Sequence, residues 1–255
     1  MAMKKLSAIC GVAVALLMSP AWCGPVHADG MRSSKGAEQE ATERGVWYGG
    51  FDVVKGARYV YDGLLVALNG DLGKDGFAIR VYGARVDFDQ NPGEGRGYQA
   101  DFMVGYLFNI RDISGSIFVG PDWQNIKLSP DDPTAEVRGT EFGVRVAADL
   151  RTAEKLPYFV NLSGSYSSAF NSYWSRLRMG AKLSGVTLGP EVIALGNESF
   201  DAQRVGAFAT FKLPRTSIEI TLSGGHQFVS GSDGGTTGTG GAEGTYGAIG
   251  FSTTF

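Results

Sequence analysis

Cysteine is almost missing from this sequence, which contains two in 255 residues. Both of them, Cys10 and Cys23, lie within residues 1–28. A chain without that segment has no disulfide, no thiol nucleophile and no cysteine-based metal site. Histidine is equally scarce, since His226 is the only one after the same segment. A disulfide-stapled scaffold and a metal centre built on several histidines are therefore excluded for the remaining chain.

Long hydrophobic runs are also missing, because a transmembrane helix needs about 20 apolar residues and no run here is that long. The longest run, Leu6–Met18, follows Lys4 and Lys5 and precedes the small-residue site Val26-His27-Ala28. This order is typical of a Sec-type signal peptide. We expect residues 1–28 to be removed during export, with cleavage after Ala28.

Neither sign of charge dominates, with 23 basic and 26 acidic residues and a formal net charge of -3. Loss of the signal segment removes Lys4 and Lys5 but no acidic residue, so the exported chain is more acidic. Mild acidity argues against nucleic acid as a partner.

The sequence contains no cofactor-binding motif. The glycine-rich stretch 231–244 lacks the Lys-Ser/Thr ending of a phosphate-binding loop, and we interpret it as a flexible outer loop.

Glycine, in contrast, is abundant, with 38 residues, about double the usual share. Residues 29–45 are polar and free of aromatic side chains, which predicts a flexible periplasmic leader. From residue 46 onward, apolar and polar residues alternate in stretches of about ten, separated by Gly, Pro, Asn and Asp clusters, as in membrane barrels. We therefore expect a signal peptide over 1–28, a leader over 29–45 and an outer-membrane β-barrel over 46–255.

The clearest strand covers Glu141–Arg151, where a period of two excludes a helix. Its apolar face holds Phe142, Val144, Val146, Ala148 and Leu150, and its polar face holds Glu141, Arg145, Asp149 and Arg151. Tyr173–Leu183 and Thr216–Phe228 repeat the pattern. In Tyr173–Leu183 three basic residues share one face, which requires a polar interior.

The same reading along the chain predicts an all-β fold, an antiparallel transmembrane β-barrel of about twelve strands. The expected strands are 46–54, 58–69, 76–88, 97–109, 114–125, 138–151, 156–167, 171–183, 186–195, 200–212, 216–229 and 245–255.

Loop lengths predict the orientation of this barrel. The three longest connections, 89–97, 126–139 and 230–244, all follow odd-numbered strands, whereas turns after even-numbered strands are short, with 69–76 as a partial exception. Long loops face outward in bacterial barrels, so short turns and both termini lie in the periplasm.

The last strand carries a further signal, because Ile249, Phe251 and the terminal Phe255 share a strand face. A strand ending in Phe resembles the signal that the outer-membrane assembly machinery recognises, although a soluble β-sandwich could also end this way.

Catalysis has one candidate base in the exported chain, His226. By register it continues the row of Ile218, Ile220 and Leu222, so we expect it to face lipid or the rim rather than the lumen. Asp131 and Asp132 lie in an outer loop between two prolines, where they can stiffen a turn or contact a cation or sugar hydroxyl.

The inward-facing polar residues form the most suggestive set. Their role is either a charge network that fills a barrel of intermediate size or a polar conduit in which aromatic rings stack on sugars and charged groups bind hydroxyls. The candidate lumen contacts are Arg80, Tyr82, Glu141, Arg145, Trp174, Arg176, Arg178, Glu191, Arg204 and Glu219, accompanied by Asp149 and Lys182.

Five separated segments resemble the bacterial cellulose biosynthesis protein BcsS family. The segments are Tyr61-Asp62-Gly63 with Leu68-Asn69-Gly70, Lys74–Phe77 with Arg80, Leu128–Pro133, Ser168–Arg176, and Gly189-Pro190-Glu191 with Ala194–Glu198. The resemblance spans most of the exported chain but not the leader or the glycine-rich loop. It implies an accessory outer-membrane component of a cellulose synthase system, and it supplies no catalytic residues.

The leading hypothesis is a non-enzymatic barrel, with neither metal nor cofactor, that assists export or surface anchoring of cellulose or a related glucan. Its partners are outer-membrane lipid, the assembly machinery through Phe255, and cellulose or cellulose-secretion components. The alternatives are a small general porin and a barrel hydrolase or lipid-modifying enzyme that uses His226.

Overall fold

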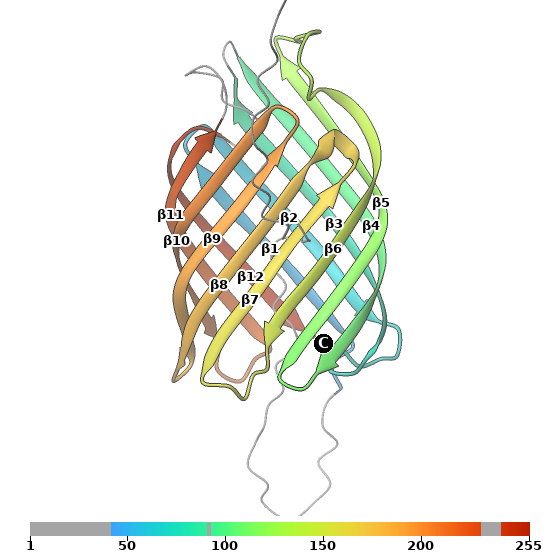
Figure 1. Ribbon diagram of the computed structural model, residues 1–255, viewed down its shortest axis with the longest axis vertical. Coiled ribbons are helices and arrows are strands. Elements are labelled where there is room, and N and C mark those ends of the chain that lie inside the picture. The colour runs from blue at the N-terminus through green and yellow to red at the C-terminus, as the bar shows by residue number, and fades with distance from the viewer. Residues whose placement is uncertain (1–41, 91–92, 231–240) are drawn as a thin grey trace, which may run out of the picture.

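The computed structural model describes residues 42–90, 93–230 and 241–255. In these residues twelve antiparallel strands pair in sequence order, and β1 pairs with β12 to close a barrel (Figure 1). The predicted signal peptide and most of the predicted leader lie outside the described residues. The strands are β1 Gly45–Val54, β2 Ala57–Ala67, β3 Gly76–Asp89, β4 Glu94–Ile110, β5 Ile113–Ser129, β6 Gly139–Thr152, β7 Tyr158–Ser167, β8 Tyr173–Leu183, β9 Val186–Asn197, β10 Phe200–Lys212, β11 Ile218–Ser230 and β12 Gly244–Thr254.

The seam between β1 and β12 closes the barrel at the end of the chain. The ladder runs from Val46 opposite Thr254 to Val54 opposite Tyr246. Below it, the Phe255 amide donates to the Gly45 carbonyl at 3.0 Å, and the Arg44 amide donates to the Phe255 carbonyl at 2.6 Å. A Cβ on Gly45 would lie 2.4 Å from Cζ of the Phe255 ring, so glycine admits that ring. The closed barrel contradicts the β-sandwich alternative.

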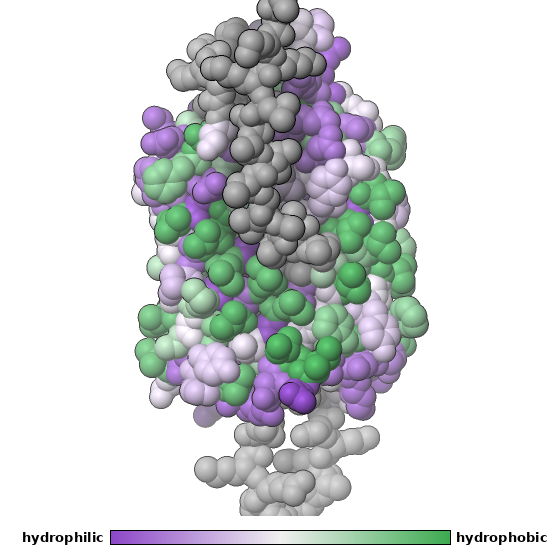
Figure 2. Space-filling model, in the orientation of Figure 1, coloured by the Kyte–Doolittle hydropathy of each residue, from purple (hydrophilic) through white to green (hydrophobic). Residues whose placement is uncertain are grey.

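Side chains alternate between the two faces of the sheet as predicted. In β6, Phe142 and Val144 are exposed on the outside while Arg145 and Asp149 are buried inside. All twelve strands place large hydrophobic side chains on the exterior, and they form an apolar band between two polar ends (Figure 2). An apolar surface of this extent does not suit a water-soluble monomer, whereas it matches a lipid-facing barrel.

Aromatic residues mark the lower edge of this band. The exposed rings of Trp47, Phe77, Tyr106, Tyr158 and Phe255 all lie near the rim where the chain ends. Phe77 and Tyr106 meet edge to face, with ring centroids 5.4 Å apart. Such girdles lie at the interface between lipid and water. No helix in the described part of the chain is long and apolar enough to cross a membrane.

Two of the predicted outer loops, 89–97 and 126–139, are shorter than expected because the strands beside them are longer. Instead of a long loop over 89–97, β3 and β4 continue to the pair Asp89 and Glu94, and β5 continues to Ser129. These strand ends extend past the rest of the upper rim in Figure 1 because polar cross-strand contacts support them, such as Arg96 Nε donating to Asp87 at 2.7 Å.

The connection over 69–76, the partial exception among the short turns, also has a structural cause. The turn between β2 and β3 folds under the barrel, where Leu72 is buried in the interior and its amide donates to the Glu43 carbonyl at 2.8 Å. Thus the end of the predicted leader is held against this rim.

A charge placed on the apolar band is expected to destabilise the barrel. Val192 faces outward in the middle of β9, so Val192→Lys should lower the free energy of unfolding in lipid vesicles by about 2–4 kcal/mol. Urea titration followed by the gel shift of the folded barrel measures this loss. Ser184→Lys, in the exposed turn between β8 and β9, is the control. Equal stability of the two variants would contradict a lipid-facing Val192.

Candidate functional site in the barrel lumen

Apolar side chains fill one part of the lumen near the periplasmic rim. We call this cluster the inner plug. It is formed by β1–β6 together with the turn between β2 and β3. Its members are Val46, Tyr48, Leu65, Ala67, Leu72, Ala78, Tyr82, Met103, Leu107, Phe118 and Ala147.

A second apolar cluster lies at the outer end, and we call it the outer cap. Its members are Val54, Ala57, Phe88, Ile126, Val137, Phe170 and Tyr246. Phe170 belongs to η1 (Ala169–Asn171), the short 3-10 turn between β7 and β8. The other members of the cluster come from β1, β2, β3, β5, β12 and the connection between β5 and β6. This turn belongs to the Ser168–Arg176 segment of the family resemblance.

Hydrogen bonds hold η1 in an unusual backbone conformation. Phe170 and Asn171 have φ values of 51° and 46°, a left-handed region that few residues other than glycine adopt. The Phe170 amide donates to Glu141 Oε2 at 3.0 Å, and the Phe170 carbonyl accepts from the Glu198 amide at 3.1 Å. The turn is therefore fixed by a side chain of β6 and by the backbone of the turn between β9 and β10, and it places Phe170 in the outer cap.

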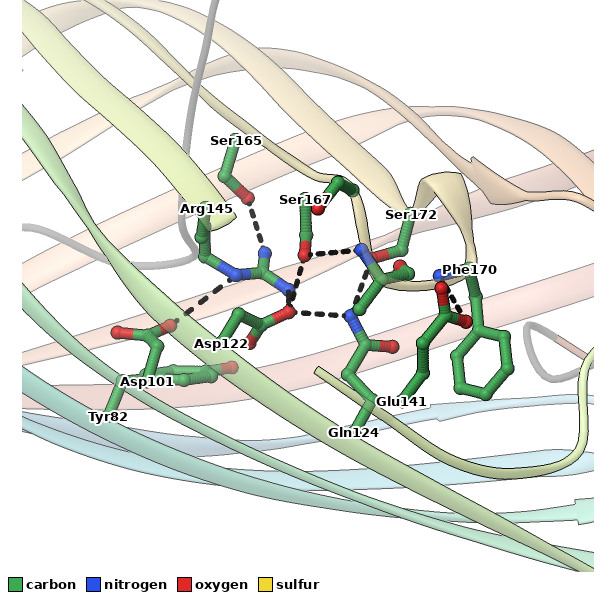
Figure 3. A network of polar contacts seen from close by, with 12 residues as sticks. Tyr82, Asp101, Asp122, Gln124, Glu141, Arg145, Ser165, Ser167, Phe170 and Ser172 are labelled. Atoms are coloured by element: carbon green, nitrogen blue, oxygen red, sulfur yellow. Dashed lines mark hydrogen bonds and ion pairs between the residues drawn. The ribbon is translucent and has the colours of Figure 1, made fainter. Parts of the chain in front are cut away.

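A buried ionic network connects the inner plug to this turn (Figure 3). Arg145 lies between two carboxylates, with Nη2 3.1 Å from Asp122 Oδ2 and Nε 3.5 Å from Asp101 Oδ2. Arg80, inside the plug, pairs with Asp101 at 3.0 Å.

At the other end of this network, Gln124 donates to Asp122 at 2.8 Å and to Ser172 Oγ, next to η1, at 2.7 Å. Because removal of one member leaves a buried charge without its partner, the network behaves as a unit.

A cavity of about 300 Å³ lies in the lumen. Its lining includes Glu154, Lys182 and Glu219 near the periplasmic rim and Ala57 and Asn197 near the outer rim, so it extends from one end of the barrel towards the other. Most of its lining between these ends comes from β7–β12 and from the tyrosines of β2 and β3.

Basic residues outnumber acidic ones in this lining. The basic residues are Arg58, Arg145, Arg151, Arg176, Arg178, Lys182 and Arg204, and the acidic ones are Asp52, Glu154, Glu191 and Glu219. Part of this excess is compensated behind the lining, where Asp101 and Asp122 pair with Arg145.

Aromatic rings cover two sides of the cavity. Tyr59, Tyr61 and Tyr82 line it from β2 and β3, with ring centroids 5.8 Å apart for Tyr59 and Tyr61 and 6.3 Å apart for Tyr61 and Tyr82. Trp174 and Phe159 line it from β8 and β7. Rings that bound a cavity and carry a few polar groups provide both apolar contact area and fixed hydrogen-bonding directions.

The structure turns all ten predicted lumen residues towards the interior. Eight of them line the cavity: Tyr82, Arg145, Trp174, Arg176, Arg178, Glu191, Arg204 and Glu219. Arg80 and Glu141 are not part of the lining; Arg80 pairs with Asp101, and Glu141 accepts the Phe170 amide. Two of the ten side chains thus support the fold around the cavity, and the other eight form part of its wall.

The two predicted outer-loop contacts are engaged within their own loop. Asp131 pairs with Arg138 at 3.0 Å. Asp132 accepts the Thr134 amide at 2.9 Å and the Thr134 hydroxyl at 2.7 Å, and these hydrogen bonds lower the pKa of Asp132. Both carboxylates thus stabilise a turn.

Several interior residues were not among the sequence candidates. Asp101 and Asp122 lie directly opposite each other on β4 and β5 and are buried. Strand parity contains a signal for Asp101, because it shares a face with Met103 and Leu107, opposite the outward Phe102 and Val104. The pairing with Arg80 and Arg145, in contrast, follows only from the closed barrel.

His226 faces outward as expected. Its side chain is 46% exposed, its ring lies 4.8 Å from that of Phe228, and its Nε2 atom lies 4.0 Å from Glu243. This position separates the imidazole from the lumen. In the described ranges no group of three or more His, Cys, Asp or Glu side chains is arranged to hold a metal ion.

The model of the family "Cellulose biosynthesis protein BcsS" matches residues 46–255. The chain belongs to this family. The matched region begins one residue after the start of β1 and includes every strand, η1 and the cavity lining. No curated protein matches the chain.

Among solved structures, the chain is similar to barrels of several kinds. The KdgM porin is 11% identical, with 82% of this chain and 99% of that chain covered and a TM-score of 0.44. The β domain of the Bordetella autotransporter BrkA is 11% identical over 84% and 100% of the two chains, with a TM-score of 0.44. A mutant of the TodX monoaromatic hydrocarbon channel is 7% identical over 84% and 91%, with a TM-score of 0.49. At these values the similarity bears on neither ligand nor role.

Removal of a carboxylate from the buried network should be costly. The Asp122 side chain is fully buried and accepts from Arg145, Gln124 and Ser167. Asp122→Ala should lower the free energy of unfolding by about 3–5 kcal/mol, because Arg145 loses a partner inside the barrel. Urea unfolding in vesicles measures the change. Asp131→Ala, which breaks an exposed pair, should cost a small part of that. A similar small loss for both variants would show that the network is not a unit.

Removal of the Phe170 ring should widen the outer end of the lumen. Phe170→Ala deletes a ring from the outer cap but leaves the backbone contacts of η1. Single-channel conductance in planar bilayers is expected to rise. Phe228→Ala removes an outward-facing ring of the same size as a control and should leave conductance unchanged. An unchanged conductance for Phe170→Ala would mean that the ring does not restrict the lumen.

Proposed function

We propose that this protein is a non-enzymatic outer-membrane barrel that assists export or surface anchoring of cellulose or a related glucan. One observation carries the proposal: a cavity that extends between the two rims and is lined by aromatic rings and hydrogen-bonding charged groups. A glucan chain presents flat apolar ring faces and many equatorial hydroxyl groups. Tyr61 and Trp174 offer surfaces for the rings, and Glu191 and Arg178 offer partners for the hydroxyls.

The surroundings of the cavity support this location and these partners. The apolar band fits the lipid of a bacterial outer membrane, and the predicted signal peptide supplies the route across the inner membrane. Phe255, exposed at the end of the seam, is the contact we propose for the outer-membrane assembly machinery. Membership of the cellulose biosynthesis family supports cellulose-secretion components as partners.

A non-enzymatic role is supported by the separation of His226 from the cavity, since a general base must lie within hydrogen-bonding reach of the proton that it removes. The second candidate is a small general porin, which the extent of the cavity also favours. The two differ in whether glucan interacts with the lumen wall.

Gene deletion with complementation tests the proposal. Loss of the gene should reduce secreted, surface-attached glucan, and the wild-type gene should restore it. Trp174→Ala should restore it incompletely, because the substitution removes an aromatic surface from the cavity wall. Trp47→Ala, on the outer surface, is the matched control and should restore glucan fully at equal outer-membrane protein levels.

Normal amounts of surface glucan in the deletion strain would overturn the role in export or anchoring. Full restoration by Trp174→Ala would show that the Trp174 ring does not contact the glucan.

A further inference from the structure

Among the described residues five arginine side chains are buried, and four of them pair with a carboxylate. Arg80 pairs with Asp101, Arg145 with Asp122 and Asp101, Arg178 with Glu191, and Arg204 with Asp52. The fifth, Arg176, has no carboxylate within 4.0 Å among the described residues. The barrel wall thus supplies an anion for each buried guanidinium except one.

Arg176 is nevertheless deeply buried, with 7% of its surface exposed. Its Nε atom is inaccessible and has no hydrogen-bond acceptor in the described part of the chain. Its guanidinium lies over the ring of Trp174, 5.2 Å from the centroid, and both residues line the cavity. The guanidinium is therefore in contact with an aromatic face at the cavity wall and has no direct ion pair with a carboxylate of the described residues.

The neighbouring carboxylates are occupied by other groups. Asp149, on the second strand away from Arg176, accepts from Asn161 at 3.1 Å and from Ser163 at 2.9 Å. Glu191 accepts from Arg178 and from the Tyr246 hydroxyl at 3.1 Å. Neither acid is within ion-pair distance of Arg176, so its guanidinium retains unused donors.

A buried cation without a partner is unfavourable, and an anion that enters the cavity would relieve this cost. The guanidinium group presents its donors as a planar fork that matches a carboxylate in two parallel hydrogen bonds. Aromatic rings on both sides of the cavity add a preference for a ligand with an extended, flat body.

We propose that Arg176 anchors a binding site for the carboxylate of an acidic saccharide, with Trp174 orienting the guanidinium at the cavity wall. The proposal rests on the proposed glucan function and gives it a chemical preference: the lumen favours a sugar chain that carries negatively charged groups over a neutral one. Arg178, already paired with Glu191, remains a contact for hydroxyl groups.

Isothermal titration of the purified full-length barrel in detergent tests this preference with two probes of the same size. One is cellobiose, and the other is cellobiouronic acid, its derivative with a carboxylate at C6. The wild-type protein is expected to bind the acidic disaccharide at least about tenfold more tightly, with an advantage that shrinks as salt is raised. Arg176→Gln should abolish the advantage and leave cellobiose binding within about threefold. Arg176→Lys should keep part of it. Arg85→Gln, which removes an outward-facing arginine, should keep all of it.

The outcomes separate the two proposals. Equal affinity of the wild-type protein for both disaccharides overturns the anionic preference and leaves the glucan role intact. Binding of the acidic sugar alone supports the site at Arg176 and contradicts a conduit for neutral glucan. Competition by sodium acetate as effective as that by the acidic disaccharide would reveal an adventitious ion only, and would overturn a saccharide site.

If Arg176→Gln does not fold, the affinities of the wild-type protein for the two disaccharides still test the preference for an anionic sugar, and Arg176→Lys tests the residue. If that variant folds but keeps the tenfold preference, the anchor is not Arg176.

Discussion

The structure depends on one constraint, that backbone amides and carbonyls surrounded by lipid can bond only to each other. An open sheet would leave one strand edge unpaired inside the membrane, which costs several kcal/mol for each group. The seam between β1 and β12 removes that edge, and the bonds between Gly45 and Phe255 continue the closure to the end of the chain. Once the sheet is closed, strand alternation leaves one face for lipid and the other for the lumen.

The composition of the lumen follows from this closure. Charged side chains are costly where they face lipid, and the buried arginines and acids of the strands converge inside, where each needs a partner. The network through Arg145 meets this need and connects the inner plug with η1. Because the plug fills the side next to β1–β6, the cavity is displaced towards β7–β12. The position of the cavity is thus a consequence of how the interior charges and apolar groups are distributed.

The strands and their two faces could be predicted from the sequence, because apolar and polar residues alternate with a period of two along each strand, and this pattern is local. All twelve strands were found within a few residues, and the inward face of β6, β8 and β11 was correct. The exceptions are non-local. The extension of β3, β4 and β5 depends on cross-strand contacts above the apolar band, and the insertion of Leu72 and Phe170 into the lumen depends on a closed barrel that receives them. Ion-pair partners such as Asp101 and Asp122 likewise come from strands that only folding places beside Arg145.

The central claim is that the cavity wall interacts with a glucan chain, and single-channel recording with added cello-oligosaccharide tests it most directly. The purified barrel in a planar bilayer should show transient interruptions of the current whose frequency increases with oligosaccharide concentration and whose duration increases with chain length. A steady current that is unaffected by cello-oligosaccharides at any concentration would contradict the account and identify the protein as a general porin.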